Sequence, residues 1–188
     1  MGSEGCVLIF ILRGPRRLLI VWFGHLFSSF RLLIDHSFFF SSRVLGQASA
    51  LAGLCQRVGG SARVSYIKPH GALYHAVMEG GEQGEAVRAA AQLLELPLLL
   101  MPRSPWATYG EGFAERAYDG DALRPREKEG ALIHDPVEAA QQAVALANAH
   151  ADLHSICVHG DSPDAVTIAR AVRSALEGEG YRLEAFTR

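Results

Sequence analysis

The sequence contains little lysine, little cysteine and almost no net charge. Lys68 and Lys128 are the only lysines among 188 residues, and the formal net charge is −2. Nothing in this balance indicates a nucleic acid or a strongly acidic partner. The three cysteines, Cys6, Cys55 and Cys157, are scattered and show no CxxC or Cys/His zinc spacing. We therefore expect free thiols in a reducing compartment, here the cytoplasm.

A long transmembrane run is also missing. Residues 18–30 (LLIVWFGHLFSSF) form an apolar stretch that contains His25 and is flanked by Arg17 and Arg31. A membrane-spanning helix needs about 20 apolar residues in a row, so this stretch is too short. The preceding arginines fit a signal peptide, but no A-x-A-like site follows, and the arginine-rich, acid-poor bias also resembles a transit peptide. Targeting, membrane attachment and a degenerate or misread segment stay open as alternatives for residues 1–42.

The composition changes near residue 43. Seven of the nine phenylalanines precede that point, whereas the chain from Arg43 onward is rich in alanine and acidic residues. We therefore divide the chain into an atypical apolar segment, residues 1–42, and one β/α domain, residues 43–188.

Helix-like and strand-like patterns alternate after residue 43. Helices are predicted where apolar residues recur at helical spacing, over residues 44–58, 82–96, 136–150 and 163–178. Strands are predicted at short apolar runs, over residues 64–67, 98–101, 155–158 and 182–186. Between them lies a long polar loop, residues 102–129, with one or two helical turns around residues 111–118. This β-α-β-α order predicts parallel strands in a barrel or a wound sheet.

Two of these helices begin with similar signals. Asp135 and Pro136 are expected to be the N-cap and first helical residue, with Glu138 completing a capping box. Ser162 and Pro163 are expected to open the last helix in the same way. The inward face of the first of these helices is predicted to hold Val137, Ala140, Val144 and Ala147.

Polar clusters follow two predicted strands at the place where a parallel α/β fold puts its active site. Lys68 and His70 follow the strand that ends at residue 67, and His159 and Asp161 follow the strand that ends at residue 158. Lysine supplies a cation for an anionic oxygen, and histidine carries a proton near neutral pH. We predict Lys68, His70 and Asp161 as catalytic groups on one pocket rim. A turn histidine at position 70 and a helix-cap acid at position 161 are the alternatives.

Three further residues are candidates of lower rank. Arg116, in the long loop, is predicted to clamp a substrate carboxylate or phosphate, with a surface salt bridge as the alternative. Tyr74 is either a hydrogen-bond donor to substrate or a core residue, and His134 ends a strand-like run. We find no GxGxxG, P-loop, GxSxG or HExxH motif.

Four segments together resemble one family. IKPHGALYH, EGFAERAYDGDALRPR, GALIHDP and ICVHGDSPDAV occur in the order and at about the separations of the LamB/YcsF family. The resemblance covers roughly residues 43–188, and the KPHGALY and CVHGDSP stretches are specific to the family. It implies a (β/α) barrel related to the polysaccharide deacetylase and TIM-like folds, incomplete here at its N-terminus.

The resemblance also implies a function. The family's best-defined member is the A-type subunit of the bacterial ATP-dependent 5-oxoprolinase, which works with subunits B and C to open the lactam of 5-oxoproline. ATP is therefore expected through the complex. Within this expectation, Lys68, His70 and Asp161 are the catalytic groups, and Arg116, Tyr74 and His159 bind or orient the substrate.

Residues 1–42 depart from the family pattern. Members begin with an Asn-Cys-Asp-Leu-Gly-Glu type motif and continue with Gly-Phe-His-Ala-Gly-Asp and Gly-Ala-His-Pro motifs, none of which occurs here. Because the acidic and histidine groups of those motifs are missing, we predict no bound metal. An inactive remnant that retains at most its partner contacts is the alternative to an active enzyme component, and a membrane-attached protein is a third, weaker one.

Overall fold

The computed structural model describes residues 7–8, 36–59 and 63–187, with side chains from residue 41 onward. The chain divides into two compact units. Of the described residues, 36–59, 63–110 and 187 belong to the N-terminal unit, and 7–8 and 111–186 belong to the C-terminal unit.

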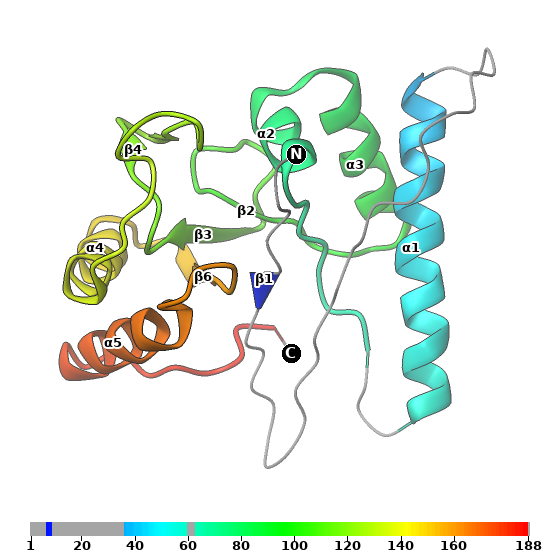
Figure 1. Ribbon diagram of the computed structural model, residues 1–188. Helices are drawn as coiled ribbons and strands as arrows, with labels where there is room; N and C mark the ends of the chain where they lie inside the picture. The colour runs from blue at the N-terminus through cyan, green and yellow to red at the C-terminus, as the bar shows by residue number, and fades with distance from the viewer. Residues whose placement is uncertain (1–6, 9–35, 60–62, 188) are drawn as a thin grey trace. The chain divides into compact units, whose positions relative to one another are not determined.

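Three helices form most of the N-terminal unit. They are α1 (His36–Val58), α2 (Ala72–Glu79) and α3 (Gly81–Leu93). Helix α3 packs against both α1 and α2 (Figure 1). Its buried stripe includes Val87, Ala90 and Ala91, at the spacing of one helical face. The two helices predicted in this part of the domain are therefore confirmed, although α1 begins earlier and α3 ends sooner.

Helix α3 ends in a hydrogen-bonded reversal before Pro97 is reached. Glu95 adopts a left-handed conformation with φ of 53°. Its N–H donates to the Gln92 carbonyl at 3.1 Å, and the Leu96 N–H donates to the Ala91 carbonyl at 2.9 Å. These two bonds make a Schellman cap, which satisfies the last carbonyls of the helix.

Parallel strand pairing joins the segments that follow. Strand β2 (Leu99–Leu100) pairs in parallel with the first residues of β3 (Tyr109–Phe113). The predicted strand at residues 64–67 is reduced to a single parallel bridge between Ile67 and Leu98. Leu99 and Leu100 are fully buried, as expected of a parallel strand covered on both faces. The fold is thus α/β with parallel pairing.

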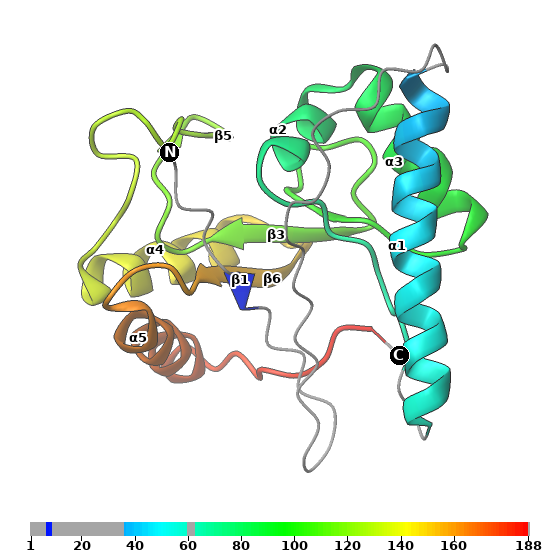
Figure 2. The same ribbon diagram turned by 45° about the vertical axis from the view of Figure 1, so that its right-hand side comes forward.

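The C-terminal unit is built on β6 and two helices. Strand β6 (Leu153–His159) lies between β3 and the antiparallel β1 (Val7–Leu8), which confirms the predicted strand at residues 155–158. Helices α4 (Pro136–Ala149) and α5 (Ala165–Gly178) lie side by side (Figure 2). Their shared core contains Ala114, Ala139, Ala140, Ala143, Ile168, Val172 and Leu176. The small alanines of α4 allow the larger side chains of α5 to pack closely.

The predicted N-cap and first residue of α4 are confirmed, while the capping box with Glu138 stays a prediction. The Asp135 carboxylate accepts from the N–H groups of Val137 at 2.7 Å and Glu138 at 3.0 Å, and Pro136 is the first helical residue. The predicted inward position of Val137 is wrong, since its side chain is 63% exposed. The buried stripe is instead centred on Ala139 and Ala143. Val137 lies in the first turn of the helix, where a side chain can still face solvent.

Three other expectations are corrected by the structure. Residues 111–118 are not helical: β3 occupies their first part, and Tyr118 belongs to a hairpin of β4 (Tyr118–Asp119) and β5 (Ala122–Leu123). Pairing with neighbouring strands outweighs the weak local pattern there. Residues 182–186 form no strand, and α5 begins at Ala165 rather than at Pro163, with no side-chain cap bond from Asp164.

Candidate active site

The ends of two strands meet in the C-terminal unit. The Ala114 N–H, just after β3, donates to the Cys157 carbonyl of β6 at 3.1 Å. This bond sets the two strand ends side by side, so Glu115 stands next to His159, the last residue of β6. Polar side chains at such strand ends are where α/β folds place their chemistry.

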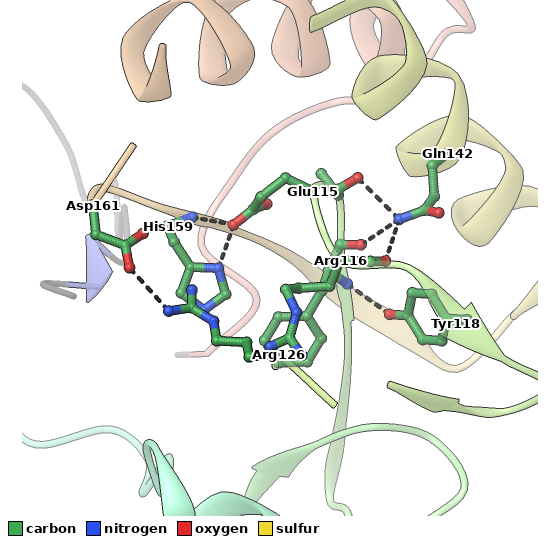
Figure 3. Close-up of polar contacts among 9 residues, drawn as sticks. Glu115, Arg116, Tyr118, Arg126, Gln142, His159 and Asp161 are labelled. Carbon is green, nitrogen blue, oxygen red and sulfur yellow. Dashed lines mark hydrogen bonds and ion pairs between the residues drawn. The ribbon is translucent and has the colours of Figure 1, made fainter. Parts of the chain in front are cut away.

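A buried carboxylate holds the histidine in place. Glu115 Oε1 accepts from the His159 N–H at 2.6 Å and also contacts Nδ1 of the His159 ring (Figure 3). Their side chains are 8% and 13% exposed. The ring also stacks on Phe113, with centroids 5.8 Å apart and planes inclined by 15°. Because Nδ1 is engaged, Nε2 is the nitrogen through which His159 can exchange a proton with a ligand.

Asp161 lies beyond the histidine and pairs with an arginine of the long loop. Its Oδ2 accepts from Arg126 Nη1 at 3.1 Å (Figure 3). Burial raises the pKa of Asp161, but the hydrogen bond and charge of Arg126, together with His159, outweigh this and leave the pKa below its usual range. Since α5 begins only at Ala165, Asp161 is not its N-cap.

Arg116 lies inside the loop rather than on its surface. Only 4% of the Arg116 surface is exposed, and its Nη2 donates to the Arg124 carbonyl at 2.8 Å. Burial lowers the pKa of its guanidinium, and the charge of Arg126 adds to this effect. The predicted substrate clamp at Arg116 stays a prediction, while its observed contacts support the loop.

Gln142 of α4 also holds this loop to the core. Its Nε2 lies 2.8–2.9 Å from the carbonyl oxygens of Phe113, Ala114 and Arg116 (Figure 3). A single amide therefore ties the segment after β3 to α4, which fixes the backbone on both sides of Glu115.

The second predicted cluster lies in the N-terminal unit. Lys68 and His70 are half-buried and follow the bridge at Ile67, at its carboxyl end. Gly71 has φ of 58° and leads directly into α2. Tyr74, in the first turn of α2, is 4% exposed. Each unit therefore contains one of the two polar clusters, and their convergence on one rim stays a prediction.

Sequence reasoning missed Glu115 and Arg126. The rule that identified Lys68 and His159, a polar residue just after a buried strand, applies equally to Glu115. Two of the five residues in YGEGF (residues 109–113) are glycines, so this segment lacks the apolar pattern of a strand and β3 was not predicted. Without a predicted strand, the rule could not be applied to the residues that follow it. No sequence signal distinguished Arg126 from the other loop arginines.

Metal clusters and membrane helices are both absent from the part of the chain that the structure describes. Among those residues, no group of three or more histidine, cysteine, aspartate or glutamate side chains is arranged to hold a metal ion. No helix in the same described ranges has the length and apolar character needed to cross a membrane.

The chain is similar to a set of bacterial proteins. The sequence profile of the LamB/YcsF family matches residues 37–188. The A-type subunit of 5-oxoprolinase from Mycobacterium leprae (strain Br4923) is 38% identical over 167 residues, covering 76% of this chain and 65% of that protein. The corresponding 5-oxoprolinase component of Paracidovorax citrulli (strain AAC00-1) is 39% identical over 166 residues, with the same two coverages. The chain thus spans 65% of the length of these relatives.

A solved structure resembles the fold as well. The crystal structure of the lactam utilization protein from Thermus thermophilus matches with a TM-score of 0.70 and 30% sequence identity, covering 83% of this chain and 70% of that chain. The profile match, the sequence relatives and this structural match all agree. The chain belongs to the LamB/YcsF family.

Proposed function

We propose that the chain is the A-type subunit of an ATP-dependent 5-oxoprolinase, which opens the lactam of 5-oxoproline to give glutamate. The observation that supports this most is the buried Glu115–His159 pair beside Asp161, in a chain whose relatives have that name. We also propose that the complete fold is a (β/α) barrel of the deacetylase-like type, and that the protein works in the cytoplasm.

The proposed reaction needs an activated lactam and a positioned water. ATP supplies a phosphoryl group to the lactam oxygen, which makes the ring carbon electrophilic. ADP leaves in this transfer. Water then adds to that carbon, the ring C–N bond breaks, and the nitrogen leaves with a proton, so an acyl phosphate remains. A second water hydrolyses the acyl phosphate to the side-chain carboxylate of glutamate and inorganic phosphate. Because the sequence contains no P-loop, we assign ATP use to the complex with subunits B and C.

His159 is the group best placed for proton transfer. Glu115 fixes the ring through Nδ1, so Nε2 can take a proton from water and return it to the leaving nitrogen. Asp161 has a lowered pKa and stays charged, so it serves as an acceptor that orients water rather than as an acid. Lys68 is the proposed cation for the developing oxyanion and His70 a second proton carrier.

Activity of the reconstituted complex tests this function. We would combine the chain with subunits B and C and measure glutamate released from 5-oxoproline in the presence of ATP. His159→Gln is expected to lower turnover by about 10²- to 10⁴-fold, the usual size of general acid–base catalysis. Lys68→Ala and His70→Ala are expected to abolish turnover while circular dichroism stays unchanged.

The control is His150→Gln, which changes the C-cap histidine of α4 in the same unit as His159. It is expected to leave turnover close to that of the unmodified chain. Full activity of His159→Gln would contradict the proposed role of the histidine. An unmodified chain that binds subunits B and C but shows no turnover would instead identify the inactive remnant.

A further inference from the structure

Arg126 occupies an unusual place in the long loop. It lies between β5 and α4. Its side chain contacts Asp161, which is 35 positions later in the chain and just beyond His159 (Figure 3). The Arg126 and Asp161 side chains are 40% and 24% exposed, so a ligand in solution can reach both.

The backbone before Arg126 is firmly held. The Arg124 N–H donates to the Ala117 carbonyl at 2.8 Å, and the Arg124 guanidinium pairs with Asp119 at 2.8–3.0 Å. The Lys128 N–H then donates to the Pro125 carbonyl at 3.0 Å, which closes a turn around Arg126. Arg126 is therefore a long cationic side chain on an anchored turn, which keeps its guanidinium near the end of β6.

The guanidinium has capacity to bind a further anion. Within the part of the chain that the structure describes, its carboxylate partner is Asp161, and the contact is made through Nη1 alone. A guanidinium presents five N–H donors in a planar fork, which suits two-point binding of a carboxylate. Arg116 lies close enough for the charge of Arg126 to lower its pKa, so an incoming anion meets two interacting cations.

We propose that Arg126 binds the carboxylate of the substrate, and that Asp161 holds the guanidinium in position and competes with that carboxylate. The inference rests on the proposed function, in which this group is the carboxylate of 5-oxoproline. Arg126 is then a specificity residue: it selects lactams that carry an acid group and sets that group beside His159. Arg126 is the more accessible of the two arginines, because 4% of the surface of Arg116 is exposed.

Isothermal titration calorimetry on the full chain measures the binding of four small ligands. Together they separate the contribution of the carboxylate from that of the lactam ring. They are 5-oxoproline, 2-pyrrolidinone (the same lactam without the acid), cyclopentanecarboxylate (the acid without the lactam) and inorganic phosphate. The variants are Arg126→Gln, Arg126→Lys and Asp161→Asn, with Arg103→Gln as the control because Arg103 is an exposed arginine of the other unit. Circular dichroism checks that each variant is folded.

The expected pattern depends on the carboxylate. Arg126→Gln should weaken 5-oxoproline binding by about 10- to 100-fold, the size of a lost charge-assisted hydrogen bond, and leave 2-pyrrolidinone unchanged. Arg126→Lys should fall between, since it keeps the charge and loses the fork. Asp161→Asn should tighten binding of 5-oxoproline and cyclopentanecarboxylate, because the competing anion is gone. Arg103→Gln should have no effect.

Other outcomes overturn one proposal or the other. The role of Arg126 would be overturned if 5-oxoproline and 2-pyrrolidinone bound equally well and Arg126→Gln left both affinities unchanged. It would also be overturned if neither ligand with a carboxylate bound to the chain. Phosphate binding that depends on Arg126, with no such dependence for 5-oxoproline, would also overturn it. Equal binding of cyclopentanecarboxylate and 5-oxoproline, lost in Arg126→Gln, would support Arg126 and contradict the lactam function.

Discussion

Glu115 and His159, 44 positions apart in sequence, meet through two contacts to a single carboxylate oxygen. The second oxygen, Oε2, is buried without a hydrogen-bond partner among the residues that the structure describes. A carboxylate in this setting depends on the histidine for its stability, and the histidine depends on the carboxylate for its orientation.

Removing the carboxylate should therefore cost stability. Glu115→Ala leaves the His159 N–H and Nδ1 without their acceptor, so we expect the free energy of unfolding to fall by about 2–3 kcal/mol. Urea denaturation measures this loss, and nitrogen NMR of the imidazole reports the change in ring tautomer. Glu127→Ala is the matched control, because Glu127 lies exposed in the same loop. Equal stabilities of the two variants would contradict the pairing.

The cap of α4 gives a second test. Asp135→Ala removes an acceptor for two backbone N–H groups, and we expect the free energy of unfolding to fall by about 1 kcal/mol. Asp164→Ala is the control, since Asp164 stands at the N-cap of α5 without a side-chain cap bond. Thermal denaturation should show a clearly smaller shift for Asp164→Ala. Similar shifts would show that the carboxylate acts through charge alone.

Two helical glycines should respond to alanine in opposite directions. A Cβ at Gly84 would lie 2.4 Å and 2.7 Å from ring atoms of Trp106, whereas a Cβ at Gly46 meets nothing within 4 Å. Gly84→Ala is expected to destabilise the protein by about 1 kcal/mol and to change the tryptophan emission, because the indole must move. Gly46→Ala should stabilise it by about 0.5–1 kcal/mol through helix propensity, without that change. Stabilisation by both variants would contradict the packing at Trp106.

Tyr118 should make stability depend on high pH. Burial raises the pKa of its phenol to about 12, although the hydrogen bond from the Phe113 N–H works against this, and Glu111 adds to the rise. A raised pKa means that the stabilising contribution is complete below the ordinary value of 10.0 and is lost as pH rises towards 12. A pKa difference of this size corresponds to about 3 kcal/mol.

Spectroscopic titration checks this expectation. Phenolate absorbance of the unmodified chain minus that of Tyr118→Phe should show a transition near pH 12, and the stability of Tyr118→Phe should fall less steeply above pH 10. A difference transition near the ordinary pKa of tyrosine would show that Tyr118 is exposed to solvent.

Much of the fold followed from local signals. The apolar stripe of α3 and the Asp-Pro start of α4 predicted both helices, because helix periodicity and capping depend on residues a few positions apart. The same local reasoning failed at residues 111–118. Strand β3 is specified by partners far away in sequence, and two of its five residues are glycines without a side-chain pattern.

The candidate site, like the fold, was predicted from the sequence only in part. The order of residues was enough to predict the family and the two strand-end motifs around Lys68 and His159, since a motif is a local property of the chain. Only the tertiary structure shows that Glu115 holds His159 and that Arg126 reaches Asp161. Both contacts join segments more than thirty positions apart, and they form because the ends of β3 and β6 and an anchored hairpin bring those segments together.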